Sequence, residues 1–448
     1  MKLAKKKSDT IDFGKSNFSR YRRLAKEGSW IVIGQIASIA ASLVLVRVLT
    51  EHLAPTQYGQ LALGLTVVGL VGQVVMGGIG NGISRFYSIA AEKQDLSGYL
   101  RASRRLMVYA TGAVLVIGLI LMTGLFWLGY SQWVGLAAAA LVLSLLGAYN
   151  SSLSGIQNAA RQRAVVAFHG GLDGWLKILL AVGVMLWLGN SSTAVVIGYA
   201  LSSLLVTGSQ FIFLRRLVKH PIKSNGANNE WINQLWTYSW PFSVWGIFTW
   251  MQQISDRWSL EAFANSAEVG QYAVLFQLGY TPINLATGLA TSLLGPILFQ
   301  RSGAAEDDAR NRNVHQIVWR ITLTGLLFTM FSFLLAMGLH QWIFRLFVAT
   351  QFRAASYLLP WMVLSGGLFA AGQVLGLKLM SEIKSSSMIS VKITTALLGI
   401  VCNIYGAAVA GLQGVVSALI AFSVIYFLWM VFLAYHCPEI VKTQADPI

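Results

Sequence analysis

The sequence predicts an all-α membrane protein in which twelve transmembrane helices form two similar six-helix lobes around a central cavity. Three observations predict this fold. The first is composition: hydrophobic residues make up 55% of the 448 residues and charged residues only 11%, whereas a soluble domain carries about 25% charged residues. The second is that the apolar residues gather into stretches long enough to cross a bilayer, which takes about 20 residues. The third is an internal repeat.

The apolar stretches place the twelve helices in order along the chain. They cover residues 28–50, 59–85, 105–129, 133–156, 165–189, 193–217, 237–260, 270–299, 314–339, 356–380, 387–411 and 413–436. A polar, turn-rich segment separates the first six from the last six. We therefore expect a basic tail at 1–27, a first lobe at 28–217, a linker at 218–236, a second lobe at 237–437 and a second tail at 438–448.

The two halves share residues at an almost constant offset. Ser29-Trp30, Arg47, Glu51 and Gly59-Gln60 recur as Ser239-Trp240, Arg257, Glu261 and Gly270-Gln271. In both halves the repeat begins at the start of a long apolar stretch and places one arginine near its far end. Repeated halves built of membrane-spanning helices are typical of transporters, and their substrate site lies where the halves meet.

Basic residues are distributed unequally between the two sides of the predicted membrane domain. Of the 33 Lys and Arg residues, 28 lie in the two tails and in the loops on the same side, four lie on the opposite side, and Lys177 lies within a span. The positive-inside rule therefore predicts that both termini are cytoplasmic. This distribution also explains the net charge of +16 without a nucleic-acid partner.

The N-terminal tail allows two interpretations. Its basic residues lead into a full-length span rather than the short apolar core of a cleaved secretory signal. Residues 13–26 mix Phe, Tyr and Leu with basic side chains. They suit either an interfacial helix on the anionic inner leaflet or a disordered positive anchor.

The helix predicted at 165–189 carries the most unusual polar residues. His169, Asp173 and Lys177 are spaced four apart and therefore share one face. Asp173 and Lys177 lie near the bilayer midplane, where an ionised side chain costs about 2.5–3.5 kcal/mol and normally faces a partner or water. One interpretation is a purely structural ion pair. The other is a cavity in which Lys177 binds substrate phosphate and Asp173 binds a coupling ion, H+ or Na+.

Arg47 and Arg257 are expected at the same depth in the two lobes, near the outer ends of their helices. One interpretation is that each arginine forms a surface ion pair with the glutamate four residues later, Glu51 or Glu261. The other is that the two arginines form a ring of positive charge that binds phosphate, since arginine binds phosphate bidentately. Asp256 is a second candidate for ion coupling.

Amide side chains inside apolar stretches supply candidate sugar-binding groups. Gln35, Gln73 and Gln252 are the ones we select. Each alone is explained by an interhelical hydrogen bond, but together they suit a hydrated cavity that accepts sugar hydroxyls. The two cysteines have no metal-binding spacing, and we expect neither a disulfide nor a cofactor. The glycine-rich run 78–82 lies in an apolar stretch, which favours close packing or bending over nucleotide binding.

The segment from Arg47 to Gly59, with Pro55 and Tyr58-Gly59 after the first helix, resembles the corresponding segment of polysaccharide flippases. Those are the Wzx-type members of the multidrug/oligosaccharidyl-lipid/polysaccharide exporter superfamily. Arg85-Phe86-Tyr87, Pro296, Asn403-Ile-Tyr-Gly406 and Gly411-Leu-Gln-Gly414 are further points of similarity. The six-plus-six layout agrees over the whole chain. The related lipid II flippases usually have two more helices, which argues against that branch.

The resemblance implies two bundles in a V shape that alternate between inward and outward openings. It implies a cationic cavity for the head of an undecaprenyl-diphosphate-linked glycan, whose tail stays in the bilayer, with Arg47 and Arg257 as matching cations. Lys177 and Asp173 match no motif of the family. The polysaccharide polymerase machinery is a further candidate partner.

Two other classes of function stay open from the sequence. A multidrug or organic cation antiporter of the same fold should have a more acidic cavity. A membrane enzyme or a scaffold of a glycan pathway has no catalytic constellation here, and no Walker motif is present, so we do not expect an enzyme.

Overall fold

The chain is all-helical in the computed structural model, which we describe over residues 13–217, 228–288, 298, 308–381 and 387–436. These residues contain no strand. The N-terminal lobe comprises α1 (Phe13–His52), α2 (Pro55–Leu70), the π-helical turn η1 (Val71–Val75), α3 (Met76–Glu92), α4 (Leu96–Trp127), α5 (Ser131–Ala159), α6 (Arg163–Leu188) and α7 (Ser192–Leu217). The C-terminal lobe comprises α8 (Asn228–Phe263), α9 (Ser266–Leu275), the π-helical turn η2 (Phe276–Tyr280), α11 (Asp308–Phe347), the 3₁₀ segment η3 (Thr350–Leu358), α12 (Leu359–Ser381) and α13 (Ser387–His436).

The predicted fold class is confirmed, with local differences. The second predicted helix is α2, η1 and α3 in succession. The last two predicted helices form α13, whose backbone leaves the helical conformation at Ala410 and Gly411; Gly411 has φ of 51°, which a glycine adopts without strain. The eighth predicted helix begins with α9 and η2, and its end, with Pro296, lies outside the described residues.

The chain ends and the linker differ from the loops that the sequence suggested. Residues 1–12, 218–227 and 437–448 lie outside the described residues, but 13–27 are helical and continue into the first span. Residues 228–236 of the predicted linker form the start of α8. They fold because Leu235 is fully buried against the N-terminal lobe and Trp231, only 6% exposed, donates to the Asp95 carboxylate at 2.8 Å.

The surface is that of a multi-pass membrane protein. Among the described residues, nine helical segments are long and apolar enough to span a bilayer, and one of them, 393–435, contains the bend at Gly411. Large apolar side chains such as Ile120, Leu327 and Phe328 are exposed on the outside of the bundle. Trp127 and Trp187 are 85% and 84% exposed near one end of the helices, where tryptophans typically lie at the membrane interface.

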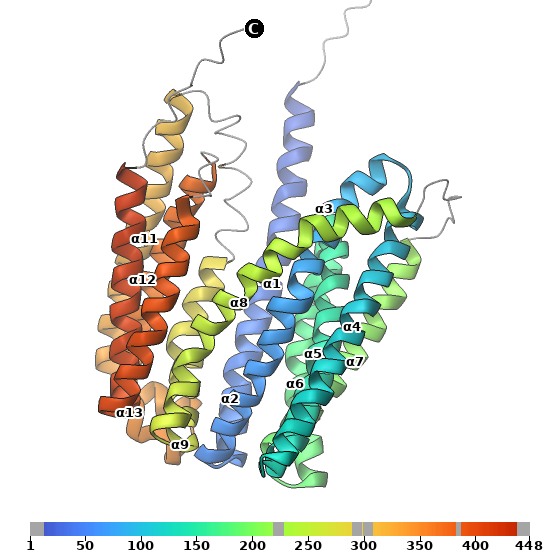
Figure 1. Cartoon of the computed structure of the whole chain (residues 1–448). Helices are drawn as coiled ribbons and strands as arrows, with labels where there is room; N and C mark the ends of the chain where they lie inside the picture. Colours follow the sequence, from blue (N-terminus) through green and yellow to red (C-terminus); the bar gives the residue numbers. More distant parts are fainter. Residues whose placement is uncertain (1–12, 218–227, 289–297, 299–307, 382–386, 437–448) are drawn as a thin grey trace, which may run out of the picture.

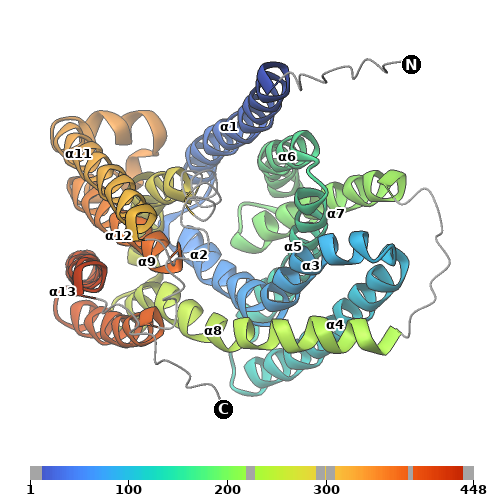
Figure 2. The same cartoon turned by 90° about the horizontal axis from the view of Figure 1, so that it is seen from above.

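The two lobes share one apolar core at one end of the bundle and have separate cores toward the other. Figure 1 and Figure 2 show α11, α12 and α13 on one side of the molecule and α4, α5 and α7 on the other. We call the end with loops 53–54, 189–191 and 264–265 the low-charge end, and the opposite end the basic end. The shared core joins residues such as Leu53 and Tyr58 to Tyr272 and Phe352. Because the cores are separate toward the basic end, the lobes are held together mainly at the low-charge end.

The repeated glycines meet across this junction. A Cβ atom on Gly59 would overlap the backbone of Ser266, and one on Gly270 would overlap the Pro55 carbonyl and lie 3.1 Å from the Gly59 nitrogen. Helices α2 and α9 therefore approach along matching repeat positions. Pro55, whose fixed φ suits the first helical position, begins α2 at this junction.

Helix α8 crosses from one lobe to the other (Figure 2). Its first part packs against α3, where Gly78 and Gly82 lie against Ser239 and Ser243. Its middle part still contacts the N-terminal lobe, since Trp250 donates to the Thr66 carbonyl at 2.9 Å. Its later part reaches α13, where Asn403 donates to Ser255 at 2.8 Å. Pro241 lies inside α8 and removes one backbone donor there. The glycine-rich run of the second predicted helix thus serves close packing, and η1 interrupts the regular helix just before it.

Gly270→Ala is expected to lower the melting temperature of the purified protein, because a methyl group there forces α2 and α9 apart, a cost of roughly 1–3 kcal/mol. The matched control is Gly183→Ala in α6, where a Cβ meets nothing within 4 Å. That variant should melt at or slightly above the wild-type temperature, since alanine favours a helix. Thermal unfolding in detergent measures both, and equal melting temperatures for the two variants would contradict this role of the junction.

Candidate functional site

A cavity of about 690 Å³, which we call the central cavity, lies between the two lobes. Helices α1, α2, α5, α6 and α7 contribute its N-terminal-lobe wall, and α8, α9 and η2 contribute the opposite wall. Its chemically active lining comprises Tyr58, Asn150, Ser151, Ser154, His169, Asp173, Lys177, Tyr199, Ser203, Gln210, Arg257 and Gln277. The place where the repeat predicted a substrate site is therefore hollow and polar.

Asp173 and Lys177 form an ion pair in the wall of this cavity. The Lys177 ammonium donates to the Asp173 carboxylate at 2.5 Å, and the side chains are 29% and 18% exposed. Ser202 donates to the other carboxylate oxygen at 3.1 Å. An ammonium has three N–H donors, and this pair uses one of them. Lys177 is thus paired and still able to bind a second anion.

His169 lies on the same face of α6 but has a structural environment. Its side chain is 1% exposed, and its ring nitrogens lie 2.8 Å from the Val165 carbonyl oxygen and 3.0 Å from the Ser209 hydroxyl. Both nitrogens therefore have partners within the protein. The shared face that the sequence indicated is real, but only its two charged members are available to a ligand.

Arg257 enters the central cavity from the other lobe. Its guanidinium carbon lies 5.1 Å from the centre of the Phe276 ring, and its Nε atom is buried without a hydrogen-bond partner. Among the described residues, no carboxylate lies within ion-pair distance of this guanidinium. Glu261, four residues on, instead accepts from Ser266 at 2.8 Å. Arg257 is therefore a partly buried cation that forms no ion pair among the described residues.

Arg47, the repeat partner of Arg257, has a different setting. It pairs with Glu51 and donates to the backbone oxygens of Val348 at 3.1 Å and Arg345 at 3.4 Å. It does not line the central cavity. The structure thus places Arg47 at the junction between lobes at the low-charge end, in the carboxylate pair that the sequence left open as one alternative.

The predicted ion-coupling residue Asp256 lies in a neighbouring pocket of about 420 Å³ within the C-terminal lobe. It is 3% exposed, and its carboxylate accepts from the Tyr272 hydroxyl at 2.5 Å and from the Arg257 backbone N–H at 2.7 Å. Gln252 lines the same pocket. Arg257 lines both this pocket and the central cavity, so it links the two.

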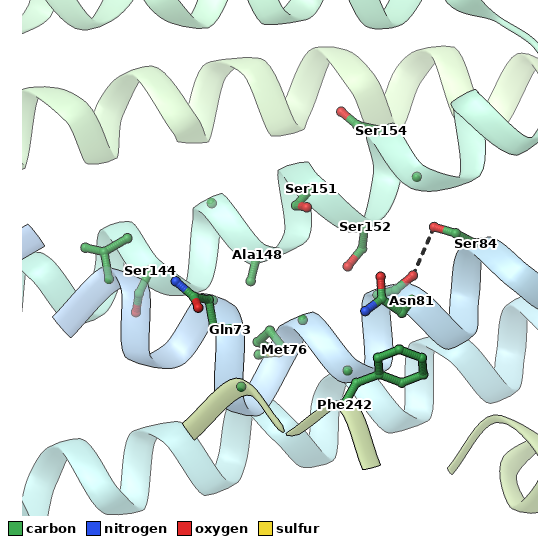
Figure 3. A pocket seen from close by; sticks show the side chains of 18 of the residues that line it. Gln73, Met76, Asn81, Ser84, Ser144, Ala148, Ser151, Ser152, Ser154 and Phe242 are labelled. Atoms are coloured by element: carbon green, nitrogen blue, oxygen red, sulfur yellow. Dashed lines mark hydrogen bonds between the residues drawn. The ribbon is translucent and has the colours of Figure 1, made fainter. Parts of the chain in front are cut away.

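A third cavity, of about 810 Å³, is lined by α2, η1, α3, α5 and α8, and we call it the neutral cavity (Figure 3). Gln73 lines it and donates to the Gln253 side chain of α8 at 2.8 Å. Gln35, the last of the predicted site residues, is partly buried and does not line these cavities.

The sequence analysis did not select the polar residues of α5 and α7. Asn150, Ser151, Ser154 and Gln210 all line the central cavity. The available signal was a cluster of four polar residues within the five positions 150–154 of an apolar helix. Serine and asparagine also occur at ordinary helix contacts, so this signal alone does not separate a cavity wall from packing.

The electrostatic balance of the central cavity is positive. Lys177 and Arg257 contribute two positive charges and Asp173 one negative charge. In a site of low dielectric constant an unbalanced charge is expensive and attracts a counter-charge strongly. Within the described residues, no group of three or more His, Cys, Asp or Glu side chains is positioned to bind a metal ion. The arrangement is suited to an anion that enters between the lobes.

Three comparisons place the chain among known proteins. Residues 24–302, more than half of its length, match the model of the family described as "Polysaccharide biosynthesis protein". No curated protein matches.

Solved structures of MATE transporters share the fold. A MATE protein in the straight conformation is 16% identical, with a TM-score of 0.62 over 92% of this chain and 95% of its own. A multidrug resistance MATE family transporter of the MOP superfamily, in an inward-facing conformation, is 14% identical, with a TM-score of 0.60 over 88% and 94%. A mutant of the Vibrio cholerae MATE transporter VcmN is 18% identical, with a TM-score of 0.60 over 94% and 97%. These likenesses concern the fold.

The family match and the fold confirm the resemblance that the sequence indicated. The match includes Arg257 and the N-terminal lobe from residue 24 onward, and the structural likeness covers both lobes. This chain belongs to the polysaccharide biosynthesis protein family and is a multi-pass membrane protein that shares the fold of MATE transporters.

Proposed function

We propose that this protein is a flippase that moves a polyprenyl-diphosphate-linked oligosaccharide from the cytoplasmic to the outer leaflet of the bacterial inner membrane. The observation that carries the proposal is Arg257: a partly buried guanidinium without an ion-pair partner among the described residues, in a cavity that also holds Lys177 from the other lobe. The two termini lie on the cytoplasmic side in this proposal, as the distribution of basic residues predicts.

A diphosphate suits this pair of cations. An arginine fork binds two phosphate oxygens at once, and a lysine adds a point charge. The ligand replaces water around both cations, so its own hydration is exchanged for charge-assisted hydrogen bonds. The cations come from different lobes, so one anion contacts both lobes at the same time. The lipid tail stays in the bilayer at the opening between them.

Alternating access follows from where the lobes are joined. In this structure they share a core at the low-charge end and have separate cores toward the basic end, which is an inward opening in the proposed orientation. A bound anion removes the repulsion between Lys177 and Arg257 and so favours approach of the lobes at the basic end. A ligand shifts a conformational equilibrium only by such a difference in affinity between states. The contacts of Arg47 with the backbone near Val348 must break for the outer end to open.

Asp173 is the group best placed for ion coupling. Its carboxylate holds the Lys177 ammonium at 2.5 Å. A phosphate that binds Lys177 competes with that carboxylate, and the released Asp173 then takes up H+ or Na+. Asp256 is less suited, because both of its carboxylate oxygens already accept hydrogen bonds from Tyr272 and Arg257.

The alternative is a multidrug or organic cation antiporter. The C-terminal-lobe pocket offers one observation in its favour, since it combines Asp256 with the aromatic rings of Phe276, Tyr280 and Phe369. Arg257 lines the same pocket, however, and repels a cation there. Expression in a strain without its own drug exporters distinguishes the two functions: we expect no increase in resistance to cationic dyes. A clear increase in resistance that depends on Asp256 would favour the antiporter.

Arg257→Ala or Lys177→Ala is expected to reduce export of the surface polysaccharide about tenfold or more, the effect of losing at least 1.4 kcal/mol of anion binding. Arg257→Lys should retain part of the activity, because it keeps the charge and loses the fork. A deletion strain complemented with each variant provides the measurement, as the amount of lipid-linked glycan that accumulates on the cytoplasmic leaflet. Membrane levels of the protein should stay normal. Arg101→Ala, an exposed cation on α4 away from the cavities, is the matched control. Full export by both cavity variants would refute the proposed anion site.

Asp173→Asn is expected to uncouple transport from the ion gradient. Asparagine keeps the shape and the hydrogen bond from Ser202 but neither pairs with Lys177 as an anion nor binds a proton. Purified protein in liposomes should then exchange substrate between leaflets at a rate that no longer responds to an imposed H+ or Na+ gradient. A variant that still accelerates with the gradient as the wild type does would assign coupling to another residue.

A further inference from the structure

The neutral cavity adjoins the central cavity. Both cavities are lined by Val68, Gly147, Ser151 and Ser154. Ser151 and Ser154 lie on α5, which forms a common wall. A molecule whose charged group is bound by Lys177 and Arg257 can therefore extend past α5 into the neutral cavity.

The lining of the neutral cavity combines apolar surface with polar side chains that carry no charge. Amides of Gln73, Asn81 and Asn158 and several serine hydroxyls line it, together with the ring of Phe242, and no lining residue carries a charge. In Figure 3 Gln73, Met76 and Asn81 face Ser144, Ala148, Ser151 and Ser152 of α5 across the cavity. Amides and hydroxyls both donate and accept, so the lining matches the hydroxyls of a sugar. A charged group in this cavity would lose its hydration without gaining an ionic partner.

Two helical glycines keep the neutral cavity open. A Cβ atom on Gly72 or Gly147 meets nothing within 4 Å, so helix packing does not require glycine at either position in this structure. Glycine inside a helix costs about 1 kcal/mol relative to alanine. Larger side chains at these two positions would project into the space that the cavity occupies.

A buried acceptor at the common wall lacks a partner. The Gln210 side chain is 1% exposed and lines the central cavity, and its amide nitrogen donates to Asn150 at 2.6 Å and to Ser154 at 2.9 Å. Its carbonyl oxygen Oε1 accepts no hydrogen bond from the described residues. Leaving a buried acceptor unpaired costs about 1–3 kcal/mol. Because this oxygen is closed to the cavity in this structure, a ligand hydroxyl would reach it only after the Gln210 side chain rotates.

We propose that the neutral cavity binds the uncharged sugar rings of the transported glycan, while the central cavity binds the diphosphate. This inference rests on the proposed function and adds a specificity to it: the cavity selects neutral, hydroxyl-rich oligosaccharides by size. Its volume of about 810 Å³ lies in the upper part of the usual range for small-molecule sites, about 300–1,000 Å³, which leaves room for more than one sugar ring.

The test compares two probes in proteoliposomes: polyprenyl diphosphate that carries one neutral N-acetylhexosamine, and the same lipid that carries a neutral tetrasaccharide. Movement is measured as the fraction of each probe that becomes accessible to a membrane-impermeant oxidant. Gly72→Leu is expected to slow the tetrasaccharide about tenfold while the monosaccharide stays within about twofold of wild type, because Gly72 lines the neutral cavity and not the central cavity, so the leucine fills the former and leaves the cations in place. Gly183→Leu, on the exposed face of α6, is the matched control and should move both probes normally.

Asn81→Ala provides a second variant that removes an amide without filling space. It should slow the tetrasaccharide several-fold, with little effect on the monosaccharide and on the melting temperature. Equal slowing of both probes by Gly72→Leu would mean that the glycine serves the conformational change, and unchanged transport of the tetrasaccharide would mean that its sugars lie elsewhere; either result overturns this inference and leaves the diphosphate site standing. A wild-type protein that moves neither probe would instead refute the flippase function itself.

Discussion

The charge of Arg257 constrains the rest of the site. A guanidinium is protonated at any physiological pH, so burial cannot neutralise it, and the described part of the chain supplies no carboxylate within ion-pair distance. The Phe276 ring offsets part of the cost, since a cation over an aromatic face gains about 0.5–2 kcal/mol. The remaining cost requires water or an anion beside it, and therefore a cavity large enough to hold one. The polar walls around Arg257 are the structural consequence of that requirement.

Lys177 is also a cation within the membrane domain, but a carboxylate compensates its charge. Its Asp173 partner makes the cation tolerable in the membrane at all times, and the pair's partial exposure to the cavity keeps it accessible. A paired cation and an unpaired one on opposite walls give a site with a modest excess of positive charge. Such a site attracts an anion without holding it irreversibly, because Asp173 competes for Lys177. Release is as necessary to a transporter as binding.

The internal repeat has diverged at its most conspicuous residue. Arg47 and Arg257 occupy matching sequence positions, yet Arg47 pairs with Glu51 and contacts the other lobe through backbone oxygens, whereas Glu261 is engaged by Ser266 and leaves Arg257 alone. By contrast, Gly59 and Gly270 keep equivalent roles, since each lies against the backbone of the other half. The repeat therefore preserved the backbone approach that joins the lobes. Its charged side chains acquired separate tasks, one in lobe contact and one in the cavity.

The sequence by itself determined the fold class, the approximate positions of the helices and the importance of the α6 face, because each depends on local properties: hydrophobic length, repeated spacing and the cost of charge in lipid. It also indicated that the site lies between lobes. Only the tertiary structure decided that Arg257 lines the cavity and Arg47 does not. The difference depends on which side chain contacts each nearby carboxylate: Glu51 pairs with Arg47, whereas Glu261 accepts from Ser266. The same holds for Gln210, Asn81 and Gly147, whose surroundings come from helices far apart in the chain. Ordinary helix packing and a cavity wall use the same small polar residues, and only the space beside them tells the two apart.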